Sequence, residues 1–120
     1  MSINARVSDP DCLFCRIARG EIPSRKVYED DEVLVFHDIN PAAPVHFLMI
    51  PKWHTDSLVT THAADVALLG RMLVLAPQLA REQGCTNGFR VVINNGPDGG
   101  QEVNHLHIHV LGGPRPWKRL

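Results

Sequence analysis

Five short stretches rich in β-branched, aliphatic and aromatic residues are bounded by turn-forming residues, which predicts five β-strands. Gly, Pro and Asp clusters supply the turns between them, including a two-proline loop over residues 40–44. The predicted strands are Lys26–Glu29, Val33–Asp38, Val45–Ile50, Phe89–Asn95 and Gln101–Leu111.

Two other segments have helical periodicity. A short helix is predicted over Cys12–Ala18, closed by Gly20, and a long one over about Ala63–Gln83, with Gly84 directly after its end. The apolar positions of the long helix form a broad face of two adjacent stripes. These are Val66, Leu69, Leu73, Ala76 and Ala80, and beside them Leu68, Met72, Leu75 and Leu79. Strands in succession with two inserted helices predict an α+β fold with an antiparallel sheet.

Length and composition fit one ordinary soluble domain. The chain has 120 residues, of which 44% are hydrophobic and 21% charged. We expect a flexible segment over residues 1–10 and a single domain over residues 11–120. The net charge of −1 implies no large basic surface, so no nucleic-acid partner is expected. The sequence shows neither a signal-peptide pattern nor a long apolar run, so we expect a cytoplasmic protein without a membrane anchor.

Three histidines alternate with aliphatic residues in the last predicted strand, at His105, His107 and His109. On a strand these imidazoles share one face, and each ring nitrogen needs a partner or water. Neighbouring Cα atoms in such a row lie about 6.6 Å apart and the outer pair about 13 Å. A single three-histidine zinc site is therefore a poor fit, whereas separate roles, including nucleophilic attack by a neutral imidazole, suit the spacing. The alternative is a structural or metal-sequestering strand.

Two further features bear on chemistry. Cys12 and Cys15 have a spacing that suits a metal or redox pair better than a disulfide framework, and the third cysteine, Cys85, is expected to be a small buried hydrophobe. The turn at Gly99-Gly100, just before the histidines, allows close backbone approach, so we expect its N–H groups to cradle a phosphate.

The motif His105-Leu106-His107-Ile108-His109-Val110-Leu111 resembles the signature of the histidine triad (HIT) family. Other blocks in the same order are similar to its Hint branch, the purine nucleoside phosphoramidases. These blocks are Glu21-Ile22-Pro23, Phe36-His37-Asp38-Ile39, Pro44-Val45-His46-Phe47-Leu48-Met49-Ile50-Pro51-Lys52 and Asp98-Gly99-Gly100-Gln101, so the resemblance covers about residues 12–113.

The resemblance implies a HIT-like fold, a homodimer whose two sheets join into one, and hydrolysis of nucleoside 5′-phosphoramidates and related nucleotidyl compounds. It implies that His107 forms a nucleotidyl-histidine, that His109 contacts the phosphate and leaving group, and that His46 supports the triad from behind. A purine nucleotide with an AMP or GMP moiety is the implied ligand. The implied nucleotide-binding residues are Phe14, Phe36, His37, Asp38, Ile39, Asn94, Gly100, Gln101 and Glu102. Within this set Asp38 corresponds to the ribose-binding carboxylate, and Glu102 stands where animal members carry a serine near the leaving group.

The resemblance also implies a metal site. Bacterial members that carry the Cys-x-x-Cys pair complete a structural zinc site with two histidines, here His54 and His105, beside Cys12 and Cys15. Animal members lack the cysteines, so no cofactor is expected to be needed for catalysis. The alternative is a reduced, metal-free cysteine pair.

Two other functions stay open from the sequence. One is hydrolysis of dinucleoside polyphosphates by another branch of the same superfamily. The other is a zinc-stabilised nucleotide-binding or protein-interaction module in which catalysis is incidental.

Overall fold

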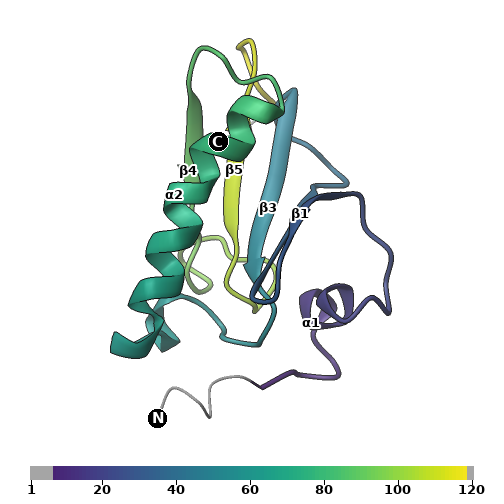
Figure 1. Ribbon diagram of the computed structural model, residues 1–120, viewed down its shortest axis with the longest axis vertical. Helices are drawn as coiled ribbons and strands as arrows, with labels where there is room; N and C mark the ends of the chain where they lie inside the picture. The colour runs from purple at the N-terminus through teal and green to yellow at the C-terminus, as the bar shows by residue number, and fades with distance from the viewer. Residues whose placement is uncertain (1–6, 119–120) are drawn as a thin grey trace.

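The computed structural model describes residues 7–118 (Figure 1). Most of the predicted flexible segment, residues 1–6, lies outside the described residues. The elements are α1 (Leu13–Ala18), β1 (Lys26–Glu29), β2 (Val33–His37), β3 (Val45–Pro51), α2 (Val66–Glu82), β4 (Phe89–Val92) and β5 (Ile108–Gly112). Two single 3₁₀ turns, Leu58–Thr60 and Ala63–Asp65, precede the long helix. The one long and one short helix predicted from the sequence are both present.

The five strands form one sheet in the order β1-β2-β3-β5-β4, and every neighbouring pair is antiparallel. The predicted α+β fold with a five-stranded antiparallel sheet is therefore confirmed. Strands β3 and β5 are central and pair Leu48 with His109 and His46 with Leu111. This register sets the histidines of two strands that are distant in sequence on neighbouring positions of the sheet.

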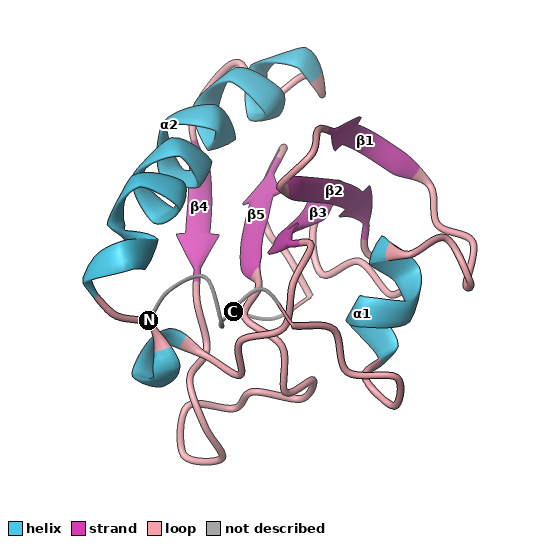
Figure 2. Cartoon of the chain, turned by 60° about the horizontal axis from the view of Figure 1, so that its bottom comes forward, coloured by secondary structure: helices cyan, strands magenta, loops and turns pink. Residues whose placement is uncertain are grey.

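The two helices lie against opposite faces of the sheet, and strand alternation decides which residues meet each one (Figure 2). On β3, Phe47 and Met49 pack with α2, whereas Leu48 and Ile50 pack with α1. His46 shares the face of Leu48, since the two residues alternate with Phe47. The catalytic candidates consequently lie on the α1 face, away from the long helix.

The last predicted strand is wrong in its first half. The structure forms β5 only over Ile108–Gly112, so His105 and His107 precede the strand. Pairing with β3 stops at Met49–Ile108, because Pro51 further along β3 has no N–H and its carbonyl accepts from the His105 ring at 2.9 Å. The backbone before the strand bonds elsewhere, with Leu106 N donating to the Thr55 carbonyl at 2.7 Å.

Three other strands differ from the prediction at their ends. Strand β4 ends at Val92 instead of Asn95, because it pairs with the shortened β5. Strand β2 ends at His37, one residue early, and β3 extends to Pro51.

The long helix begins later and buries a narrower face than predicted. Residues 63–65 form a 3₁₀ turn, and α2 runs from Val66 to Glu82. The second predicted stripe faces the sheet through Leu68, Met72 and Leu79, but Val66 and Leu73 of the first stripe are exposed. By length and mean hydropathy (1.4), Ala63–Glu82 could cross a membrane. A core helix passes the same test, and α2 packs against the central strands.

Candidate active site

A cavity of about 240 Å³ on the α1 face brings together most of the predicted catalytic and nucleotide-binding residues. It is lined by Phe14, Asp38, Asn40, His46, Leu48, Asn94, Gly100, Glu102, Val103, His107 and His109. These residues come from α1, from β3 and β5, and from the loops after β2 and β4. Residues that are far apart in the sequence therefore line one cavity together with the histidines.

The ring of His107 is held in one tautomer. Its Nδ1 lies 2.7 Å from the carbonyl oxygen of His105, so Nδ1 carries the proton and donates to that acceptor. The other ring nitrogen, Nε2, is left with its lone pair on a side chain that lines the cavity. Burial lowers the pKa of His107, against smaller raising effects of the His105 carbonyl and the charges of Asp38 and Glu102. At neutral pH the side chain is thus a neutral imidazole, the form that can act as a nucleophile.

A second hydrogen-bonded chain sets the tautomer of His109. The backbone N–H of Ala42 donates to Nδ1 of His46 at 3.0 Å, so the proton of His46 resides on Nε2. That Nε2 lies 2.9 Å from Nδ1 of His109 and 3.5 Å from an oxygen of Asp38. Because Nδ1 of His109 accepts, its own proton is on Nε2, which makes His109 a hydrogen donor. The ring of His109 is centred 4.9 Å from that of His107.

The loop that starts this chain is shaped by its prolines. Pro41 and Pro44 flank Ala42 and Ala43, which are buried against Leu111. Burial of this loop carries the Ala42 N–H to His46. The support role predicted for His46 thus has a physical basis in the backbone.

Phe14 forms the apolar end of the cavity. Its ring contacts His107 edge-on, with centroids 5.1 Å apart, and packs on Phe36 at 5.6 Å. Phe36 is buried behind Phe14 and is not among the lining residues. Ile39 is fully exposed, and His37 is also absent from the lining, so the structure does not bring these two predicted contacts into the cavity.

The glycine turn does not offer the backbone donors expected of it. The N–H groups of Gly99, Gly100 and Gln101 donate to carbonyls of Gly96 and Pro97 within the turn, at 3.1–3.2 Å. The expected cradle of these N–H groups is therefore wrong, although Gly100 does line the cavity. A side chain at Gly99 would clash, since its Cβ would run into the backbone carbonyl of Asn95.

Gln101 ties loops together instead of facing the cavity. Its side-chain amide accepts from the Gly96 N–H at 2.8 Å and donates to the carbonyls of Asp56 and Val103 at 2.6 and 2.9 Å. The predicted nucleotide contact of Gln101 is thus replaced by a role in holding the loops before β5.

Charge in the cavity wall is negative apart from the histidines. Asp38 and Glu102 are acidic, and none of the described lining residues is lysine or arginine. The side-chain hydrogen donors among the described lining residues are the histidines, Asn40 and Asn94. A bound phosphate would therefore be held by neutral donors and not by a basic cluster.

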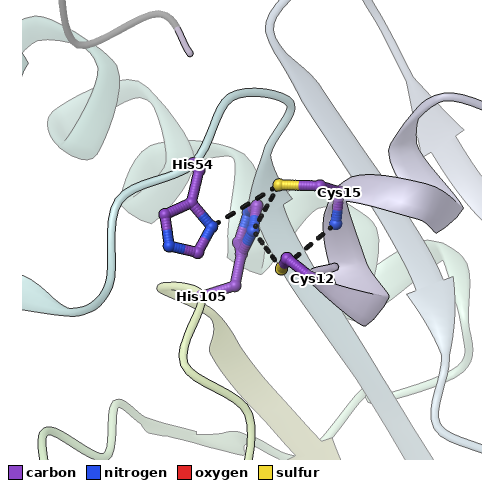
Figure 3. Close-up of side chains that lie close together, drawn as sticks. All are labelled: Cys12, Cys15, His54 and His105. Atoms are coloured by element: carbon purple, nitrogen blue, oxygen red, sulfur yellow. Dashed lines mark hydrogen bonds between the residues drawn. The ribbon is translucent and has the colours of Figure 1, made fainter. Parts of the chain in front are cut away.

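A second cluster lies beside the cavity and joins three distant segments (Figure 3). Sγ of Cys12 lies 3.4 Å from Nδ1 of His105, and Sγ of Cys15 lies 3.5 Å from Nδ1 of both His105 and His54. All four donor atoms lie within 4.8 Å of one another. This is the set of residues expected to hold a metal ion.

The geometry of the cluster fits zinc. With Zn–S near 2.3 Å and Zn–N near 2.0–2.1 Å, the edges between sulfur and nitrogen in a tetrahedron are about 3.5 Å long. Both histidines also present the required lone pair. Nε2 of His105 donates to the Pro51 carbonyl at 2.9 Å, and Nε2 of His54 lies 2.6 Å from Asp56 Oδ1, which leaves each Nδ1 free of a proton.

The surroundings of Cys12 disfavour the charged form of its thiol. Cys12 precedes α1 as its N-cap, and burial is the main cause that raises the pKa of its thiol. A divalent ion supplies the positive charge that favours a thiolate. The residues present therefore fit a closed four-ligand site.

Comparison with known proteins gives the family. The HIT domain profile matches residues 19–115. The chain belongs to the HIT family. Protein HitA from Neisseria gonorrhoeae is 53% identical over 104 residues, which are 87% of this chain and 97% of HitA. The 14 kDa zinc-binding protein from Zea mays is 46% identical over 110 residues, which are 90% of this chain and 86% of that protein.

A solved structure supports the fold. The HIT family hydrolase from Legionella pneumophila superposes with a TM-score of 0.85 at 46% identity, covering 88% of this chain and 95% of that one. This chain therefore has the fold of a HIT family hydrolase.

Three residues that line the cavity were not predicted from the sequence, namely Asn40, Leu48 and Val103. Leu48 follows His46 by two positions on β3, so period-two alternation alone places both on one face. Asn40 and Val103 lie in loops, where no periodicity predicts the direction of a side chain.

Proposed function

We propose that the protein hydrolyses nucleoside 5′-phosphoramidates, such as adenosine 5′-phosphoramidate, and related nucleotidyl compounds through a nucleotidyl-histidine on His107. The observation that carries the proposal is the hydrogen bond from Nδ1 of His107 to the His105 carbonyl at 2.7 Å. This bond fixes a neutral imidazole with the Nε2 lone pair on a residue that lines the cavity.

In the first step Nε2 of His107 attacks the α-phosphorus and forms a P–N bond, while the bond from phosphorus to the leaving amine breaks. The Nε2–H of His109 gives its proton to the departing nitrogen. In the second step a water attacks phosphorus and the bond to His107 breaks. Nε2 of His109 takes the proton from this water, and the nucleoside monophosphate departs with both histidines restored.

The rest of the wall supports a purine nucleotide. The Asp38 carboxylate suits the ribose hydroxyls as a charge-assisted acceptor, and Phe14 offers a ring to the base. The N–H of Asn40 donates to Oδ1 of Asp38 at 2.8 Å, which holds the carboxylate in place.

We further propose that Cys12, Cys15, His54 and His105 bind one structural zinc ion. The donor distances fit a tetrahedral ion, and a similar maize protein is called a zinc-binding protein. Bound zinc joins α1 to the loops before α2 and β5, so its chemistry here is structural. The catalytic steps use imidazole nitrogens of other residues.

A homodimer is the proposed assembly, with the sheet continued through β4. This strand is at the edge of the sheet, and Phe89 and Val91 on it are exposed apolar residues. Leu73 and Val74 of α2 are exposed apolar residues as well. Sedimentation of the wild type as a dimer and of Val91→Lys as a monomer would support this assembly, and a monomeric wild type would contradict it.

One assay separates the candidate functions. Pure protein is given adenosine 5′-phosphoramidate in one reaction and diadenosine polyphosphates in another, and AMP release is followed. We expect AMP from the phosphoramidate only. Product from the dinucleotides alone would assign the other branch of the superfamily, and product from neither would favour a zinc-stabilised binding module.

A further inference from the structure

We propose that Glu102 makes this site selective for phosphoramidates whose leaving amine carries an additional positive charge. The inference rests on the proposed function and adds the class of leaving group to it. It concerns one residue of the cavity wall and its position between two cavities.

Glu102 stands where the catalytic cavity meets a second one. The second cavity has a volume of about 550 Å³, and Glu102 and Val103 line both. The catalytic cavity is the smaller of the two, at about 240 Å³. In this proposal a substituent too large for the catalytic cavity extends along the wall that the two cavities share, beside Glu102.

The carboxylate of Glu102 is available to such a substituent. Within residues 7–118 Glu102 makes no hydrogen bond or ion pair, and its side chain is exposed. Asp38, the other acid of the catalytic wall, is already engaged by the Asn40 N–H and lies 3.5 Å from His46. Of the two acids in the catalytic wall, Glu102 is thus the one whose carboxylate is not engaged by another described residue.

The charge beyond Glu102 keeps the same sign. Asp9, Asp11 and Asp56 line the second cavity, and no lysine or arginine is among its described lining residues. An anionic leaving group, such as a phosphate chain, meets repulsion from Glu102 along this path, whereas an ammonium group is attracted. Because the contact is exposed to solvent, we expect about a threefold effect for each unit of charge.

The test uses three adenosine phosphoramidates of similar length, made from 1,3-diaminopropane, n-butylamine and β-alanine. Their leaving amines end in a cationic, a neutral and an anionic group. We expect kcat/KM to fall in that order, by about tenfold from first to last at low salt, with a smaller ratio at high salt. Glu102→Gln should reduce the cationic-to-anionic ratio at least about threefold. Asp31→Asn, which removes an exposed carboxylate that lines neither cavity, should leave the ratio unchanged.

The outcomes separate the two claims. If all three compounds are hydrolysed within twofold of one another, or if Glu102→Gln keeps the wild-type ratio, the inference is overturned and the proposed function stands. If none of them is hydrolysed, nor the unsubstituted phosphoramidate, both the proposed function and the inference fail.

Discussion

His105 and His107 are next-but-one neighbours in the chain, and both are buried, yet they face different chemistry. The exposed fractions of the two side chains are 0% and 5%, and burial lowers the pKa of both rings, that of His105 to about 4. His105 donates from Nε2 to the Pro51 carbonyl and turns Nδ1 toward two thiols. His107 donates from Nδ1 to the His105 carbonyl and keeps Nε2 for the cavity.

The difference teaches that burial does not decide the role of an imidazole here. A single backbone carbonyl accepts from each ring and leaves the other ring nitrogen with its lone pair, and we propose that this nitrogen is a metal ligand in His105 and a nucleophile in His107. The carbonyl of His105 is itself the acceptor for His107, so the proposed zinc ligand also orients the proposed nucleophile.

The largest effect is expected from His107→Ala, because this substitution removes the imidazole whose Nδ1 donates to the His105 carbonyl and whose Nε2 keeps its lone pair in the cavity. We expect hydrolysis of adenosine 5′-phosphoramidate to fall at least about a thousandfold, with the circular dichroism spectrum and zinc content retained. His62→Ala, at an exposed histidine before α2, is the matched control and should keep wild-type activity. A residual rate within tenfold of wild type would remove His107 from the role of nucleophile.

The chain of hydrogen bonds behind His109 should give the next effect. His46→Ala removes the donor to Nδ1 of His109, so the proton that serves the leaving group is no longer fixed on Nε2. We expect kcat to fall about tenfold to a hundredfold. The loss should be smaller for compounds with a good leaving group, such as a nitrophenol. Equal losses for good and poor leaving groups would contradict a role in proton delivery.

Asp38→Ala tests the nucleotide end of the cavity. We expect a higher KM for the ribonucleotide substrate and about a tenfold smaller preference over its 2′-deoxy analogue, because the acceptor for the ribose hydroxyls is lost. Steady-state kinetics with both substrates measures the change. An unchanged preference would mean that Asp38 does not hold the ribose.

The smallest effect on chemistry is expected on the metal side. Cys15→Ser should remove zinc and lower the melting temperature by about 10 °C, while the rate well below melting stays within about threefold of wild type. Cys85→Ala, which changes a cysteine outside the cluster, should keep the zinc content of the wild type. Full zinc occupancy in Cys15→Ser would show that the ion is bound elsewhere.

The sequence predicted the fold well because the signals were local. Alternation and turn residues located all five strands, and the helical period with Gly84 located α2. The strand ends were missed because they depend on partners: Pro51 on β3 ends the pairing that His105 and His107 were expected to continue.

The site was predicted in part, and the misses have physical causes. The motif positions His46, Asp38 and Asn94 do meet in the cavity, although their order along the chain gives no distances. Ile39 was expected in the cavity from the resemblance, but its side chain is exposed. The N–H groups of the glycine turn donate to carbonyls of the same turn and are not available to a ligand. The pairing of Nδ1 and Nε2 with particular acceptors, which separates His105 from His107, is a matter of tertiary contact that no spacing encodes.

The division between the two histidines is tested most directly by removing the metal and measuring stability and hydrolysis on the same sample. The purified protein is treated with a chelator, its zinc is quantified, and its melting temperature and rate on adenosine 5′-phosphoramidate are compared with those of the untreated protein. We expect one zinc per chain before treatment, a lower melting temperature after it, and a rate below melting that stays within about threefold of the untreated protein. A rate that vanished with the zinc and returned with it, in protein that remained folded throughout, would contradict the account.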